Sequence, residues 1–179
     1  MKKQITISVF TENHSGLLSR VTAVFTRRKI NIDSLIASES EVEDIYRFTI
    51  VVEIEEVQVK KIVKQLEKQV EVLKAFYHLN EEVVHQELAL YKVPTKVLAS
   101  GGQVEEIVRN HNARLLAVEA EFVVLEKTGH KEDIDALFTE LLPFGILEFA
   151  RSGRVAITKS MKELKDYLVE LEEQNKQTS

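Results

Sequence analysis

The sequence has no cysteine, and only two prolines and six glycines among its 179 residues. Without cysteine the chain can have no thiol nucleophile, no thiolate zinc or iron–sulfur centre and no disulfide framework. The glycines form none of the GxGxxG, GxxxxGK[ST] or GxSxG patterns that bind phosphates or present a nucleophilic serine. The five histidines form no HExxH or HxxxH pair, so we expect no metal site. A self-sufficient active site is therefore not expected, and neither is a cofactor bound to this chain.

Long apolar runs and an excess of positive charge are also missing. No apolar run approaches the roughly 18 residues of a membrane-spanning helix. The stretch after Met1-Lys2-Lys3 is too short and too polar for the core of a signal peptide. A net charge of −5 argues against a protein that coats nucleic acid, and the basic-aromatic run of an RNA-binding sheet is absent. We therefore expect a soluble cytoplasmic protein without a membrane or nucleic-acid partner.

The hydrophobic periodicity of the first half alternates between strand and helix. A period of two predicts strands at 4–11, 30–37, 46–54 and 70–79, and helical stripes fall at 17–28 and 59–66. The order β-α-β-β-α-β with two crossover helices is that of the ferredoxin-like topology. We expect an antiparallel four-stranded sheet that is covered by helices on one face.

The same order returns in the second half. Strands are predicted at 85–93, 114–120, 122–128 and 146–158, with helices at 104–112 and 134–142. The predicted fold class is therefore α+β, with ferredoxin-like βαββαβ domains at 1–80 and 81–159.

The tail at 160–179 differs from both halves. Its apolar residues Met161, Leu164, Leu168 and Leu171 fall at 3-4-3 spacing. This spacing predicts a C-terminal helix whose apolar seam packs either on its own chain or against a partner.

The turn between the first strand and the first helix is the candidate functional motif. Asn13 or Ser15 can cap a helix that begins at Leu17, and Gly16 lets the backbone bend so that amides point outward. A helix start has unpaired N–H groups and a partial positive charge, which suit a carboxylate. Asn31 should lie beside this turn, where its amide could serve a zwitterion as donor and acceptor. Plain helix capping and a carboxylate site both remain open at this point.

Three segments of the first half resemble the N-terminal ACT domain of acetolactate synthase small (regulatory) subunits. That family follows a pattern close to E-N-x-x-G-x-L-S-R-V, then F-x-x-R-x-x-N-I-x-S-L, then a hairpin that ends R-x-T-I-V-V. The matching segments here are 13–21, 25–35 and Arg47-Phe48-Thr49-Ile50-Val51-Val52.

The second half is similar to the C-terminal domain of the same family. The matching segments are Glu87-Leu88-Ala89-Leu90, Thr128-Gly129, Pro143-Phe144-Gly145-Ile146-Leu147-Glu148 and Ala150-Arg151-Ser152-Gly153. The resemblance therefore runs in order from residue 4 to about residue 158.

The resemblance implies a non-catalytic subunit of a transferase. Its partner would be the large catalytic subunit, which holds thiamine diphosphate, magnesium and FAD. The small subunit would activate that enzyme and confer feedback inhibition by valine, leucine or isoleucine, with valine the expected effector. ACT domains of this family pair side by side into a homodimer that binds the effector at its interface. Carried over by position, the expected effector-binding residues are Asn13, His14, Ser15, Gly16, Leu17 and Leu18, together with Asn31 and Ile32. The resemblance implies that Asn31 of the partner subunit closes the site.

Two other functions remain to be separated from this one. The chain could be an amino-acid-binding ACT regulator of another biosynthetic enzyme, or an independent enzyme on a ferredoxin-like scaffold. The missing acid–base and nucleophile constellations speak against an independent enzyme. The N-I-x-S-L and P-F-G-I elements favour the acetolactate synthase subunit over the other regulator.

Overall fold

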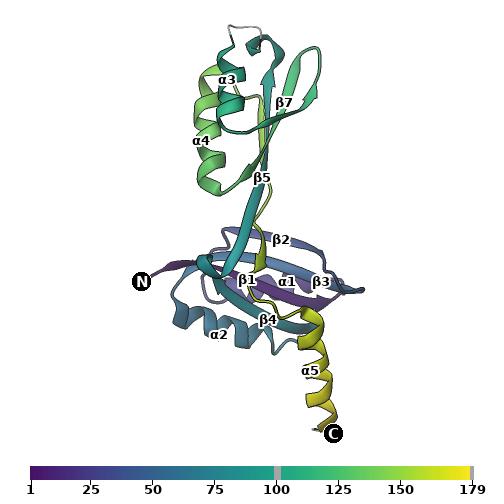
Figure 1. Cartoon of the computed structure of the whole chain (residues 1–179). Helices are drawn as coiled ribbons and strands as arrows, with labels where there is room; N and C mark the ends of the chain where they lie inside the picture. The colour runs from purple at the N-terminus through teal and green to yellow at the C-terminus, as the bar shows by residue number, and fades with distance from the viewer. Residues whose placement is uncertain (99–101, 178–179) are drawn as a thin grey trace. The chain divides into compact units, whose positions relative to one another are not determined.

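The computed structural model (Figure 1) describes residues 1–98 and 102–177, except for the side chains of 171, 172 and 174–177. Its contacts divide the chain into two compact units, Met1–Val84 with Arg154–Ser179, and His85–Gly153. Residues 154–159, which the sequence analysis placed with the second half, therefore group with the first unit.

The first unit has the predicted β-α-β-β-α-β order. The elements are β1 (Lys3–Glu12), α1 (Leu17–Thr26), β2 (Ser34–Glu39), β3 (Ile45–Ile54), α2 (Glu56–Leu66) and β4 (Val72–Leu79). The antiparallel sheet has the order β2-β3-β1-β4. The ferredoxin-like prediction is confirmed for this half.

The helices α1 and α2 pack on one face of this sheet because their apolar stripes match the alternation of the strands. Alternate β1 residues, such as Ile7, join a core with Phe25 of α1 and Ile62 of α2. Each of these side chains is fully buried, and burial of one such side chain contributes about 1.5–3 kcal/mol.

The opposite face of the first sheet is also covered, contrary to the expectation of one covered face. Thr6, Ser8 and Phe10 of β1 point away from the helices, yet all three are buried. The strand β9 (Val155–Thr158) and the helix α5 (Leu164–Gln177) belong to this unit, and β9 pairs with β5 (Val83–Pro94), whose first residues lie in the same unit.

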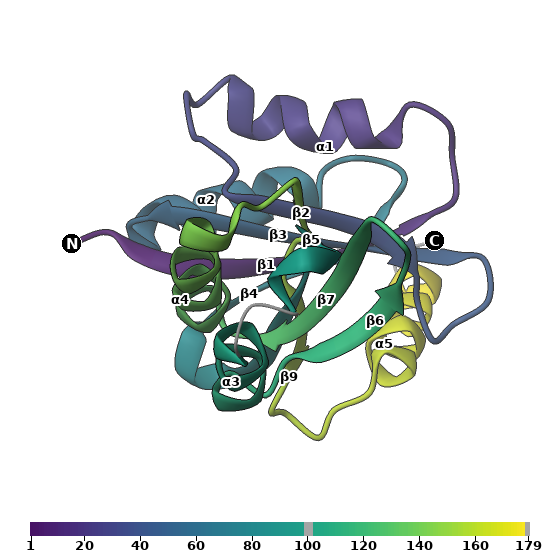
Figure 2. The same cartoon turned by 90° about the horizontal axis from the view of Figure 1, so that it is seen from above.

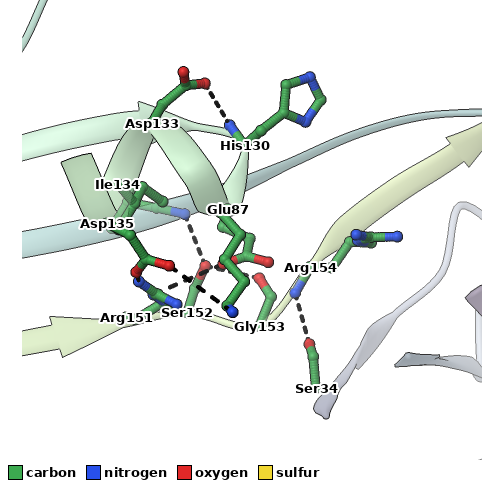
Figure 3. A network of polar contacts seen from close by, with 12 residues as sticks. Ser34, Glu87, His130, Asp133, Ile134, Asp135, Arg151, Ser152, Gly153 and Arg154 are labelled. Carbon is green, nitrogen blue, oxygen red and sulfur yellow. Dashed lines mark hydrogen bonds and ion pairs between the residues drawn. The ribbon is translucent and has the colours of Figure 1, made fainter. Parts of the chain in front are cut away.

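Arg154 fixes the chain to this face of the sheet. Its side chain is 3% exposed and donates hydrogen bonds to Thr6 Oγ1 at 3.1 Å, Asn80 Oδ1 at 2.9 Å and Gln4 Oε1 at 2.6 Å. The Arg154 backbone N–H donates to Ser34 Oγ at 2.8 Å, the bond drawn in Figure 3.

The tail packs on its own chain over part of the predicted seam. Leu164 is buried, and the ring of Tyr167 lies 4.7 Å from the ring of Phe76 in β4. Met161 precedes α5 and is 95% exposed. The side chain of Leu171 lies outside the described residues.

The second unit repeats the topology of the first. Its further elements are α3 (Gln103–Asn110), β6 (Arg114–Val118), β7 (Phe122–Gly129), α4 (Lys131–Leu141) and β8 (Glu148–Arg151). The strand order β6-β7-β5-β8 is the counterpart of β2-β3-β1-β4. In Figure 1, α3 and α4 lie on the same side of these strands. The second ferredoxin-like domain is therefore confirmed as well.

Polar contacts connect α4 of the second unit to its strands. Arg151 of β8 forms ion pairs with Asp135 of α4 and with Glu87 of β5, the latter at 3.8 Å (Figure 3). The Tyr91 hydroxyl donates to the carbonyl of Ile134 at 2.8 Å, and burial raises the pKa of Tyr91 to about 12. Arg151 therefore connects β8 to α4 and β5 and stabilises the second unit.

Candidate functional site

The turn at 13–16 connects β1 to α1 and has Gly16 at the N-cap of the helix. Gly16 adopts a left-handed conformation with φ +82°, and no side chain caps the helix. The predicted capping by Asn13 or Ser15 is therefore wrong. The left-handed N-cap replaces the extended cap residue whose side chain would normally accept an amide of the first turn.

Several backbone amides of this turn have no acceptor. The His14 N–H donates to the Glu12 carbonyl at 3.1 Å, and the Leu17 N–H donates to the His14 carbonyl at 3.4 Å. Within the described residues, no acceptor is present for the N–H groups of Ser15, Gly16, Leu18 and Ser19. Free amides at the positive end of a helix dipole can bind an anion such as a carboxylate.

An ion pair and two hydrogen bonds hold the turn in place. Arg20 of α1 pairs with Glu71, which precedes β4. Glu71 accepts from the Glu12 N–H at 3.2 Å through its carbonyl, and Gln69 Nε2 donates to the Arg20 carbonyl at 3.3 Å. A hydrogen bond from the Glu71 backbone amide, aided by Arg20, lowers the pKa of the Glu71 carboxyl. In the sequence, Arg20 stands only as part of the motif at 13–21, and no local signal there indicates this anchoring role.

The two leucines at the helix start lie in different surroundings. Leu17 is 3% exposed and belongs to the first core, whereas Leu18 is 47% exposed. Both were expected among the effector-binding residues, but the buried side chain of Leu17 is not available to contact a ligand. His14 is exposed, and its Nε2 lies 3.0 Å from Glu12 Oε2. Asn13 is exposed and has no side-chain hydrogen bond among the described residues.

Asn31 lies away from the turn of its own chain, contrary to the sequence prediction. Figure 2 shows the chain entering α1 from β1 at one end and leaving for β2 at the other. Ten helical residues separate these ends by about 15 Å. Asn31 is exposed, whereas Ile32 is half-buried against the first core. The expectation that Asn31 lies beside the turn of its own chain is therefore wrong, whereas the expectation that Asn31 of the partner subunit closes the site stays a prediction.

Neither a metal-binding cluster nor a membrane-spanning helix is found among the described residues. No group of three or more histidine, aspartate or glutamate side chains there could hold a metal ion. No helix among those residues is long and apolar enough to cross a membrane.

The first unit matches a known regulatory domain. Residues 7–74 match the sequence model of the AHAS small subunit-like ACT domain, in agreement with the βαββαβ fold and the turn after β1. The chain is therefore an ACT-domain protein. Residues 86–160 match the family described as small subunit of acetolactate synthase.

Relatives match along almost their whole lengths. An acetolactate synthase small subunit from Mycobacterium bovis is 40% identical over 157 residues, which are 88% of this chain and 93% of the relative. The Bacillus subtilis small subunit is 36% identical over 164 residues, 91% of this chain and 94% of the relative. The crystal structure of the Thermotoga maritima small subunit superposes with a TM-score of 0.80 at 28% identity, covering 89% of this chain and 99% of that one. The chain belongs to the family of acetolactate synthase small subunits.

Proposed function

We propose that this chain binds the large catalytic subunit of acetolactate synthase, raises its activity and makes it sensitive to feedback inhibition by a branched-chain amino acid, with valine the effector. Family membership over both halves of the chain supports the assembly. The turn with free amides supports the binding of an amino acid, and it is the observation that carries this part of the proposal.

The effector carboxylate binds the amides at the start of α1. The N–H groups of Ser15, Gly16 and Leu18 need an acceptor, and a hydrogen bond to a charged group contributes about 1.5–3 kcal/mol. Leu18 is the apolar side chain of the turn that remains exposed, so it contacts the aliphatic side chain of the effector. Thiamine diphosphate, magnesium and FAD belong to the catalytic subunit.

A homodimer supplies the second side of the effector site. β2 is the edge strand of the first sheet, so two copies can pair antiparallel along it. Through β3, Ser34 of β2 is level with Thr6 of β1, and Glu39 is level with Thr11, next to the turn. Antiparallel pairing places the end of β2 in one copy opposite the start of β2 in the other. Asn31 of the partner subunit therefore lies near the turn.

This dimer explains why Asn31 lies far from the turn of its own chain. Its amide can accept from the effector's ammonium group and donate to its carboxylate. Ile32 accompanies it at the interface and borders the pocket for the aliphatic side chain. One effector then contacts both chains, and the symmetric dimer has two such sites.

The decisive experiment measures acetolactate formed from pyruvate by the large subunit of the same organism. The large subunit is assayed alone and with this chain, and the mixture is titrated with valine, leucine and isoleucine. We expect no product from this chain alone, a several-fold higher rate from the mixture, and inhibition by valine. Product from this chain alone, or an unchanged rate in the mixture, would contradict the proposed regulatory role. A stimulated rate that no amino acid lowers would contradict the feedback part.

A further inference from the structure

The first unit has a cavity on the face of its sheet that points away from α1 and α2. Its volume is about 360 Å³. The sheet contributes Ser8 and Phe10 of β1, Arg47 of β3 and Phe76 of β4 to its walls, and the start of α5 closes it with Tyr167. Figure 1 shows α5 beginning beside this sheet. The turn at 13–16 is not part of its lining, so this cavity is separate from the effector site.

Arg47 brings a positive charge to this cavity, whose lining also includes the carboxylates of Glu41 and Glu163. The guanidinium is half-buried and donates through Nη2 to Ser8 Oγ at 3.1 Å and to the Ala156 carbonyl at 2.6 Å. Its Nε is buried without an acceptor. In the described part of the chain, no carboxylate forms an ion pair with it. Burial lowers the Arg47 pKa, and the more distant Glu41 opposes this shift. A buried N–H without an acceptor is unfavourable, and an anionic acceptor in the cavity would relieve that cost.

The remaining walls combine aromatic rings with further charged side chains, those of Glu41, Lys162, Glu163 and Lys165. The Phe76 ring lies 6.1 Å from the Phe10 ring and 4.7 Å from the Tyr167 ring. His78 lies next to Phe76 in the lining, and burial together with Arg47 lowers its pKa, which favours the neutral imidazole at pH 7. Lys162 also lines the cavity, but both Glu170 carboxylate oxygens lie 2.8 Å from its Nζ.

We propose that this cavity is a second ligand site, which takes a small monocarboxylate with an apolar or aromatic body. The carboxylate accepts hydrogen bonds from the free N–H groups of Arg47, and the body lies against Phe76 and Tyr167. Arginine and a carboxylate form strong charge-assisted hydrogen bonds. The volume lies at the small end of the range of ligand pockets, about 300–1,000 Å³.

The start of α5 forms one wall of this cavity. The family match ends at residue 160, and the α5 wall follows it. Arg47 itself lies inside the ACT domain match. The tail therefore adds a wall to a cavity that remains partly open, and ligand binding needs neither the large subunit nor the amino-acid effector.

Calorimetry with phenylacetate tests the proposal on the full-length chain, with phenylacetamide as the uncharged probe of the same shape. We expect phenylacetate to bind at least about tenfold more tightly than phenylacetamide, since only the acid can neutralise Arg47. Arg47→Gln should weaken phenylacetate binding at least about tenfold. The matched control is Arg28→Gln, because Arg28 is exposed and its side chain donates to the neutral Gln65, with no ion pair to a described residue. The control should bind phenylacetate as the unchanged chain does.

A second variant keeps the test valid if Arg47→Gln does not fold. Tyr167→Ala removes an aromatic wall and leaves Arg47 in place, and it should weaken both probes by a similar factor of about threefold or more. Absence of phenylacetate binding up to about 10 mM would overturn the proposal. Equal binding of acid and amide, or unchanged phenylacetate binding in a folded Arg47→Gln variant or in Tyr167→Ala, would overturn it as well.

Discussion

Two substitutions at Gly16 separate the effect of backbone strain on stability from the effect of a negative charge on effector binding. The φ of Gly16 is +82°, and a Cβ atom there would meet no atom within 4 Å. A side chain therefore fits, and the strain comes from the left-handed backbone alone. Asparagine and aspartate adopt this conformation more readily than other non-glycine residues. Gly16→Asn and Gly16→Asp have nearly the same shape and differ by one negative charge.

We expect both variants to lose a similar amount of stability and to differ in effector binding. The left-handed backbone costs about 1–2 kcal/mol, which lowers the melting temperature by a few degrees in a chain of this size. A carboxylate about 4 Å from the carboxylate of the effector adds about 1 kcal/mol of repulsion in a water-like dielectric. Gly16→Asp should therefore bind valine at least about fivefold more weakly than Gly16→Asn.

Calorimetric titration with valine measures the difference, and thermal melting checks that both variants fold alike. Stimulation of the large subunit should survive in both if, as two-site allostery requires, the effector site and the subunit contact are distinct. If folded Gly16→Asp and Gly16→Asn bind valine equally well, the effector carboxylate does not lie at the start of α1.

Three further predictions concern Asn31, the tail and Arg20. Asn31→Ala should weaken valine binding by about ten- to a hundredfold, because a hydrogen bond to a charged group is lost. Calorimetry measures this change, and an unchanged affinity would contradict an effector site that spans the dimer interface. A chain that ends after Lys159 loses the burial of Leu164 and an aromatic contact. Denaturant titration should therefore show a free energy of unfolding about 2–4 kcal/mol lower, while the dimer and valine binding persist. An equal free energy of unfolding would mean that the helix does not stabilise the fold. Arg20→Ala should raise the pKa of Glu71, whose lowered folded-state value stabilises the fold above the ordinary carboxyl pKa and less as pH falls. The variant should therefore lose less stability on acidification than the unchanged chain in denaturant titrations, and an identical pH dependence would contradict this coupling.

The element order of both units could be predicted from the sequence because local patterns determine it. Apolar residues alternate at Ile5, Ile7 and Val9, and the period changes to that of a helix at Leu17. These patterns extend over a few residues only, and the apolar residues that they align form part of the core of the first unit. The start of α1 at Leu17 was predicted correctly, while the identity of its cap was not, because φ at Gly16 depends on the closure of the turn.

The position of Asn31 could not be predicted because it depends on register and not on sequence distance. The β2–β3 and β3–β1 pairings place Ser34 level with Thr6, so Asn31, three residues earlier, lies at the opposite end of α1 from the turn. A site made of Asn31 and the turn therefore needs two chains. The resemblance to the family supplied that second chain; composition and periodicity could not.

The second covered face of β1 was missed for a related reason, and it explains how one strand can serve two sites. Thr6, Ser8 and Phe10 have the polar or mixed character of a solvent-facing side, yet they are buried by a segment that begins at Arg154, far along the chain. The other side of β1 packs on α1, whose start provides the free amides. The turn that we propose as the effector site and the Arg47 cavity therefore lie on opposite sides of the same strand. A chain without the tail would keep the turn and expose Phe10 and Phe76, so the tail can change ligand binding at the cavity while the amide-rich turn stays intact.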